Sequence, residues 1–82
     1  MYRIVVHRRG RPETEIGHGL EEPDVLRLFF ILHNAVHVAI DPVPLVCPRE
    51  GGEPCLIFPE EIRGLRLLSD GRDVTERVLV ED

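Results

Sequence analysis

The stretch DVLRLFFIL, residues 24–32, decides the fold of this 82-residue chain. Pro23 precedes it, where proline favours the first turn of a helix, and acidic neighbours suit the positive end of the helix dipole. These signals predict the main helix over residues 23–33, ended by Asn34 as a left-handed cap. Because phenylalanine and isoleucine also favour strands, a buried strand over 26–32 is the alternative.

The apolar side chains of this helix spread over more than one of its faces. A helix that packs on a sheet needs an apolar arc of only about 100°. The surplus around Leu26, Phe29 and Phe30 must be covered by another part of the chain or by a second subunit. We therefore expect these three side chains to form an interface in a homodimer or with another protein partner.

Short strands are predicted on both sides of the helix. Alternating apolar residues predict a strand over 2–9, and Pro12 introduces a weaker edge strand over 13–18. Later extended runs are predicted at 35–41, resuming at 45–47, and at 55–58, 65–68 and 75–80, with one helical turn near 59–62. Turns are expected at Gly51-Gly52 and at 69–71. The prediction is an α+β fold: a bent antiparallel sheet or small open barrel of about six short strands, with one main helix.

Length and composition indicate one domain over residues 1–82. The chain is 43% hydrophobic and 30% charged, values that are usual for a globular protein. All ten basic residues are arginine, and amide side chains are almost absent, a composition that suits a heat-adapted protein. The net charge is −5, although residues 1–11 hold four arginines and no acid.

The apolar run over residues 25–40 falls short of the roughly 20 residues that a membrane-spanning helix needs, and polar side chains such as Arg27 and His33 interrupt it. The first ten residues lack the apolar core of a signal peptide. We therefore expect no membrane association and a cytoplasmic location, where both cysteines are reduced.

Arg8, Arg9 and Arg11 form the sharpest charge feature. Guanidinium groups at a hairpin turn can bind phosphate or carboxylate through paired hydrogen bonds. A nucleic-acid surface also needs a basic overall balance and exposed aromatic rings. This chain is acidic overall and has no exposed aromatic ring predicted near the turn, which argues against nucleic acid as the partner. A nucleic-acid or phosphate-binding module that uses the hairpin over residues 8–11 is the alternative function.

Four side chains suggest a second alternative, a metal site: His33, His37, Cys47 and Cys55. The histidines are four residues apart, but the predicted end of the helix falls between them, and the cysteines are too far apart for a zinc knuckle. We expect no metal and no cofactor. A three-residue tip at the Gly51-Gly52 turn would place Cys47 opposite Cys55, whereas a two-residue tip would pair Cys47 with Leu56. A disulfide is possible only in the first register, and free thiols are favoured in a reducing cytosol.

No catalytic set of residues is evident. Ser69 lies in a predicted turn without the context of a nucleophile, and Glu60 and Glu61 are adjacent, so they do not face one site on a helical turn. The sequence therefore favours a small non-enzymatic interaction or regulatory domain that self-associates through its apolar helix.

Overall fold

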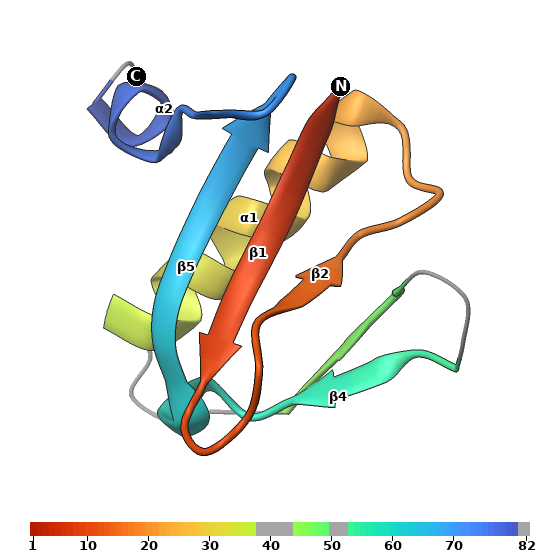
Figure 1. Cartoon of the computed structure of the whole chain (residues 1–82), viewed down its shortest axis with the longest axis vertical. Helices are drawn as coiled ribbons and strands as arrows, with labels where there is room; N and C mark the ends of the chain where they lie inside the picture. Colours follow the sequence, from red (N-terminus) through yellow and green to blue (C-terminus); the bar gives the residue numbers. More distant parts are fainter. Residues whose placement is uncertain (38–43, 50–52, 81–82) are drawn as a thin grey trace.

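The computed structural model describes residues 1–37, 44–49 and 53–80. The elements follow one another as β1 (Tyr2–Arg8), β2 (Thr14–Ile16), α1 (Glu22–His37), β3 (Leu45–Cys47), β4 (Cys55–Ile57), the short 3₁₀ helix η1 (Pro59–Glu61), β5 (Ile62–Ser69), β6 (Arg72–Asp73) and α2 (Thr75–Val80). Figure 1 shows their arrangement.

Four strands form an antiparallel sheet in the order β2-β1-β5-β6. β1 and β5 lie at its centre and pair along nearly their whole length, from Tyr2 opposite Ser69 to Arg8 opposite Ile62. β2 lies at the edge, as Pro12 indicates. The sheet is therefore open and does not close into a barrel, and the predicted α+β class is confirmed.

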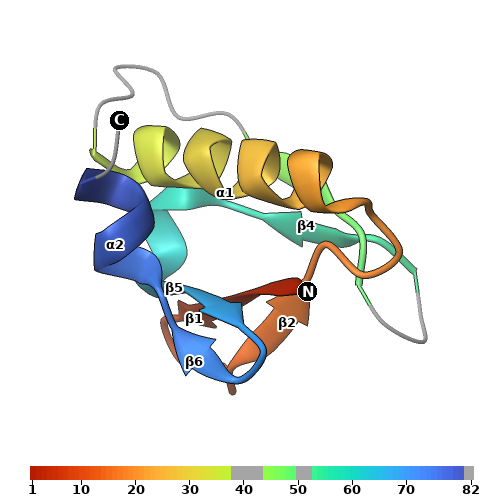
Figure 2. The ribbon, with the colours of Figure 1, turned by 90° about the horizontal axis from the view of Figure 1, so that it is seen from above.

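α1 lies across one face of this sheet (Figure 2). The side chains that alternate inward on β1, such as Ile4 and Val6, are fully buried, and so are Phe29 and Leu32 of α1. This two-layer packing is the core of the domain. The opposite face of the sheet carries the alternate side chains, which include the charged Arg3, Glu15 and Arg66 and the apolar Val5 and Leu68.

β3 and β4 form a separate two-stranded sheet, in which Cys47 is the partner of Cys55. The backbone N–H of Gly17 donates a hydrogen bond of 2.6 Å to the carbonyl of Pro48, which attaches this hairpin to the end of β2. Gly17 has a φ of +83°, a backbone conformation that residues other than glycine rarely adopt. The predicted runs at 45–47 and 55–58 are thus confirmed as strands, whereas the Gly51-Gly52 turn lies outside the described residues.

The turn predicted at 69–71 is confirmed, and it joins β5 to β6, a two-residue strand that the sequence did not predict. Asp70 and Gly71 both have positive φ, of 51° and 82°, which is the conformation of a type I′ hairpin turn. The predicted helical turn near 59–62 is also confirmed as η1, which begins at Pro59.

The predicted end of the main helix is wrong. α1 continues through Asn34 to His37, so Ala35, Val36 and His37 are helical and not part of a strand. Asn34 is exposed, and an asparagine inside a helix costs only about 0.6 kcal/mol of helix stability relative to alanine. Val36 packs against the core one helical turn after Leu32, which favours continuation of the helix. The rest of the strand predicted over 35–41 lies outside the described residues.

The predicted strand over 75–80 is also wrong, because Thr75–Val80 forms the helix α2. Val74 and Val78 both pack against the core. Residues four apart lie on the same face of a helix as well as of a strand, so their spacing fits either structure. The backbone N–H of Val74 donates a 2.8 Å hydrogen bond to the carbonyl of Leu67, which holds the start of α2 beside β5.

Candidate interaction surface

The apolar surplus of α1 is largely absorbed by the chain itself. Phe29 has none of its surface exposed, and Val25 and Leu32 are buried with it. Of the three predicted interface residues, only Leu26 and Phe30 keep part of their surface exposed. The Phe29 and Phe30 rings meet edge to face with centroids 5.8 Å apart. Ile31, which is 44% exposed, is the most exposed of the large apolar side chains on α1.

A second apolar surface lies on the β3–β4 hairpin. Its inner face, with Cys47, Cys55 and Ile57, is buried. On its outer face Val46 is 68% exposed and Leu56 is 47% exposed, and the two residues are direct cross-strand partners. Phe58, 37% exposed, continues this face because its backbone is extended. We call these three residues, Val46, Leu56 and Phe58, the hairpin patch.

Sequence reasoning missed the hairpin patch, although a signal for it exists. Residues 45–47 and 55–58 are apolar at every position. Successive side chains of a strand point to opposite faces, so an entirely apolar strand needs cover on both sides. A two-stranded hairpin that packs one face on the core leaves the other face apolar and exposed.

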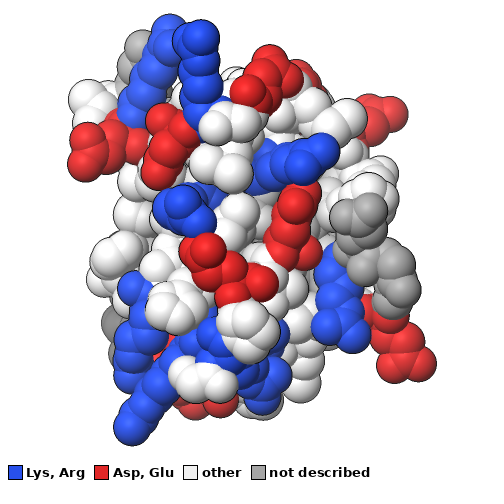
Figure 3. All heavy atoms as spheres, in the orientation of Figure 1, with Lys and Arg blue, Asp and Glu red and all other residues white. Residues whose placement is uncertain are grey.

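The structure separates the three predicted anion-binding arginines. Arg8 continues the inward alternation of β1 and is only 4% exposed. Arg9 and Arg11 are exposed in the turn that follows, where the N–H of Arg9 donates a 2.8 Å hydrogen bond to the carbonyl of Glu61. Exposed Arg63 at the start of β5 lies at the same end of the sheet, and sequence reasoning did not include it. Figure 3 shows arginine side chains gathered at this end.

Ion pairs distinguish this end of the sheet from its middle. Arg3 contacts Glu15 at 3.4 Å, and Arg66 contacts Glu13 at 2.6 Å. Within the described ranges, the side chains of Arg9, Arg11 and Arg63 make no ion pair with a carboxylate. Their charge is therefore less compensated than that of the arginines on the open face of the sheet.

Buried polar atoms mark the boundary between this turn and the core. The Nε atom of Arg8 and the Oε2 atom of Glu61 are both buried and have no hydrogen-bond partner. Such atoms are uncommon in folded proteins and call for a specific explanation. The charge of Arg8 acts on the thiol of Cys47, which lies on the buried face of the hairpin.

The four residues of the metal hypothesis lie in two separate places. His33 and His37 share a face of α1, with ring centroids 4.4 Å apart, while Cys47 and Cys55 face each other on the hairpin. Partial burial, with a smaller contribution from the nearby charge of His37, lowers the pKa of His33. In the part of the chain that is described, no three potential ligands come together.

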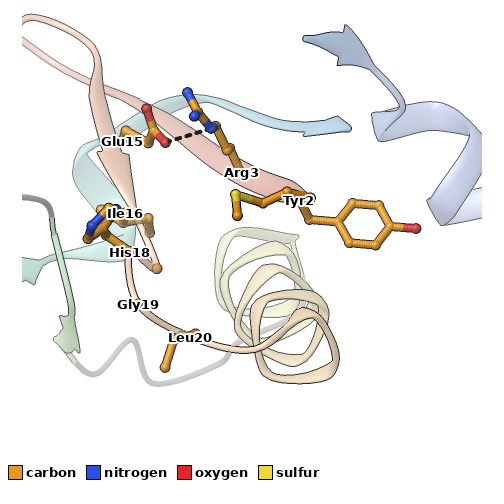
Figure 4. A pocket seen from close by; sticks show the side chains of 9 residues that line it. Tyr2, Arg3, Glu15, Ile16, His18, Gly19 and Leu20 are labelled. Atoms are coloured by element: carbon orange, nitrogen blue, oxygen red, sulfur yellow. Dashed lines mark ion pairs between the residues drawn. The ribbon is translucent and has the colours of Figure 1, made fainter. Parts of the chain in front are cut away.

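A pocket of about 300 Å³ lies between the start of β1 and the loop that leads to α1. The ion pair of Arg3 and Glu15 stands at one side of it, with His18 and Leu20 on the others, whereas the ring of Tyr2 points away (Figure 4). None of the residues predicted as a site lines this pocket. Its carboxylate is held by Arg3, and the lining contains no serine, threonine or cysteine that would serve as a nucleophile.

Comparison of the chain with protein-family models, with curated proteins and with solved structures finds no match. Among the described residues, no helix has both the length and the apolar character needed to span a membrane.

Proposed function

We propose that this chain is a non-enzymatic protein-interaction domain that self-associates, and that the hairpin patch forms the contact. The observation that carries the proposal is the pair Val46 and Leu56, directly opposite each other and 68% and 47% exposed. Isolated exposed apolar side chains are ordinary in proteins, but adjacent ones that share a face are typical of an interaction site.

A second copy suits this surface for two reasons. The outer edge of β4 pairs with no strand in the described part of the chain, so its backbone groups are open to pairing with the same edge of another copy. The patch itself is uncharged, so it offers a place where two chains of net charge −5 meet without like charges at the centre.

Arg49 follows β3 and Glu53 precedes β4, at the end of the hairpin where the chain connects the two strands, and there they can line the rim of such a contact. The Nε–H of Arg49 donates a 2.9 Å hydrogen bond to the carbonyl of Glu53. Because a two-fold axis brings the same residues of both copies together, opposite charges at the rim can pair across the interface.

Sedimentation velocity over a range of micromolar concentrations tests the proposal, because self-association makes the average mass rise with concentration. A charge within the patch, Leu56→Asp, is expected to shift the chain to a monomer. Ile31→Asp is the matched control, since Ile31 on α1 is 44% exposed and Leu56 is 47% exposed.

The two variants also separate the hairpin from the helix. Dissociation by Ile31→Asp alone would move the interface to α1, close to the predicted Phe30. A native chain that stays monomeric throughout the concentration range contradicts self-association through either surface.

Anion binding is the second candidate function, and uncompensated charge at one end of the sheet favours it. Arg9, Arg11 and Arg63 are the residues concerned. Separate titrations with inorganic phosphate and a single-stranded oligonucleotide, followed by chemical shifts, test it. We expect affinity that falls steeply with salt and is lost in the double variant Arg9→Gln/Arg11→Gln. The control is Arg27→Gln, because Arg27 is exposed and lies 3.7 Å from Asp24. Absence of binding at low salt removes this candidate.

A further inference from the structure

Cys47 and Cys55 are direct partners in the antiparallel ladder of β3 and β4, and both are free thiols. Opposed residues of an antiparallel pair have Cα atoms about 4.5 or 5.5 Å apart, depending on their place in the hydrogen-bond pattern. Disulfides accept Cα separations of roughly 4.4–6.8 Å. The register of the hairpin therefore brings the two cysteines within bonding range with little movement of the backbone.

Both side chains point to the same, buried face of the hairpin, between the strands and the core. The two thiols are close enough for their charges to interact, since ionisation of Cys55 opposes that of Cys47. Because an antiparallel pair keeps opposed side chains on one face, no strand rotation is needed for the sulfur atoms to meet.

Arg8 adds a third group to this pair. Its guanidinium is buried, its Nε has no hydrogen-bond partner, and it makes no ion pair with any described residue. Its charge favours the thiolate form of Cys47, against burial, which raises the pKa of that thiol to about 11. A cation whose charge acts on a thiol promotes thiolate formation, although at Cys47 the effect of burial is the larger one.

We propose that Cys47 and Cys55 are a paired dithiol site that undergoes exchange with small-molecule disulfides of the glutathione class and closes to an intramolecular disulfide. Arg8 acts as a positioning residue that stabilises the Cys47 thiolate during closure. The closed disulfide joins the two strands that carry the hairpin patch. The proposal does not depend on self-association.

The exchange has two balanced steps. The Cys55 thiolate, the less buried of the two, attacks one sulfur of oxidised glutathione and forms a mixed disulfide, while the first glutathione leaves as a thiolate and is protonated by water. The Cys47 thiolate then attacks the Cys55 sulfur and releases the second glutathione. In total, two protein thiols and one oxidised glutathione give one protein disulfide and two reduced glutathiones.

The test incubates the folded, reduced chain in glutathione buffers of increasing oxidised fraction and follows it by intact mass and maleimide labelling. We expect both thiols to disappear together, with no glutathione retained. In the Cys47→Ser variant we expect one stable glutathione adduct on Cys55. A lasting adduct on the native chain, a disulfide only between chains, or two thiols that stay free under oxidising conditions overturns the proposal.

The role of Arg8 is tested by the time course of closure. In Arg8→Met the mixed disulfide is expected to accumulate, because closure slows by roughly threefold for each pKa unit that Arg8 contributes to Cys47: the roughly tenfold loss of thiolate is partly offset by the greater nucleophilicity of a thiolate with a higher pKa. Arg8→Lys keeps the charge and is expected to restore closure. If Arg8 has only a structural role, the disulfide closes at the native rate in those Arg8→Met molecules that are folded. That result overturns the assignment to Arg8.

Discussion

Asp73 and Thr75 are joined by two hydrogen bonds to one carboxylate oxygen at the start of α2. The backbone N–H of Thr75 lies 2.9 Å from Oδ1 of Asp73, and the Thr75 hydroxyl lies 2.6 Å from the same atom. The hydroxyl oxygen also accepts a 2.8 Å hydrogen bond from the backbone N–H of Leu67. This small network begins α2 and fastens it to β5.

Replacing the Thr75 hydroxyl is expected to destabilise the domain. Thr75→Val keeps the shape of the side chain but leaves the N–H of Leu67 without its acceptor, a loss of about 1–2 kcal/mol. Urea unfolding followed by circular dichroism measures it. Thr14→Val is the control, because the Thr14 hydroxyl makes only a 3.4 Å hydrogen bond to the carbonyl of Pro12. An equal loss of stability in both variants would contradict a stabilising role for the Thr75 network.

The acid sensitivity of the domain should depend on Asp73. The hydrogen bond from the Thr75 hydroxyl, and then that from its backbone N–H, lowers the pKa of Asp73 below its usual 3.8. Stability from a carboxylate of lowered pKa is present above the unfolded value and is lost as the pH falls through the folded value. Carbon-detected NMR should show Asp73 titrating below the usual 3.8 and returning toward that value in Thr75→Val. If the pKa of Asp73 is the same in Thr75→Val as in the native chain, its lowered value has another cause.

Phe29 and Phe30 are adjacent in the sequence but should respond very differently to truncation. Phe29→Ala removes a fully buried ring and is expected to destabilise the chain by about 3–5 kcal/mol. Phe30→Ala removes a ring that is only partly buried, so about 1–2 kcal/mol is expected. Chemical denaturation at a low protein concentration compares them without a contribution from self-association. Similar losses in both would indicate that Phe30 is also covered.

His33 should make folding weaker in mild acid. Its pKa is lowered below the ordinary 6.5, so the unfolded chain binds a proton more readily than the folded chain. Stability from this group is therefore present above about pH 6.5 and declines as the pH falls from there toward the folded pKa. Proton NMR of the imidazole gives the folded pKa. His37→Ala should raise it only in part, because burial is the larger cause, and full recovery would assign the shift to His37.

The candidate surfaces were only partly predictable from the sequence. The apolar excess of residues 24–32 is evident in the sequence, but whether a ring such as Phe29 is buried depends on how α1 lies across β1 and β5. Those strands pair residues as distant as Tyr2 and Ser69. Arg63 joins the arginine turn for the same reason, since Arg8 pairs with Ile62 across the central ladder.

Local chemistry determined the elements whose signals lie within a few residues: the alternation of β1, the edge position after Pro12, the 3₁₀ turn at Pro59 and the hairpin turn at Asp70-Gly71. Steric and hydrogen-bond preferences of neighbouring residues are sufficient there. Tertiary structure decided the last turn of α1, the helical state of residues 75–80 and the exposed face of the β3–β4 hairpin. In the two helical segments, packing of Val36 and Val78 against the core outweighed a local preference worth less than about 1 kcal/mol per residue. On the hairpin, the placement of β3 and β4 against the core decided which face stays exposed.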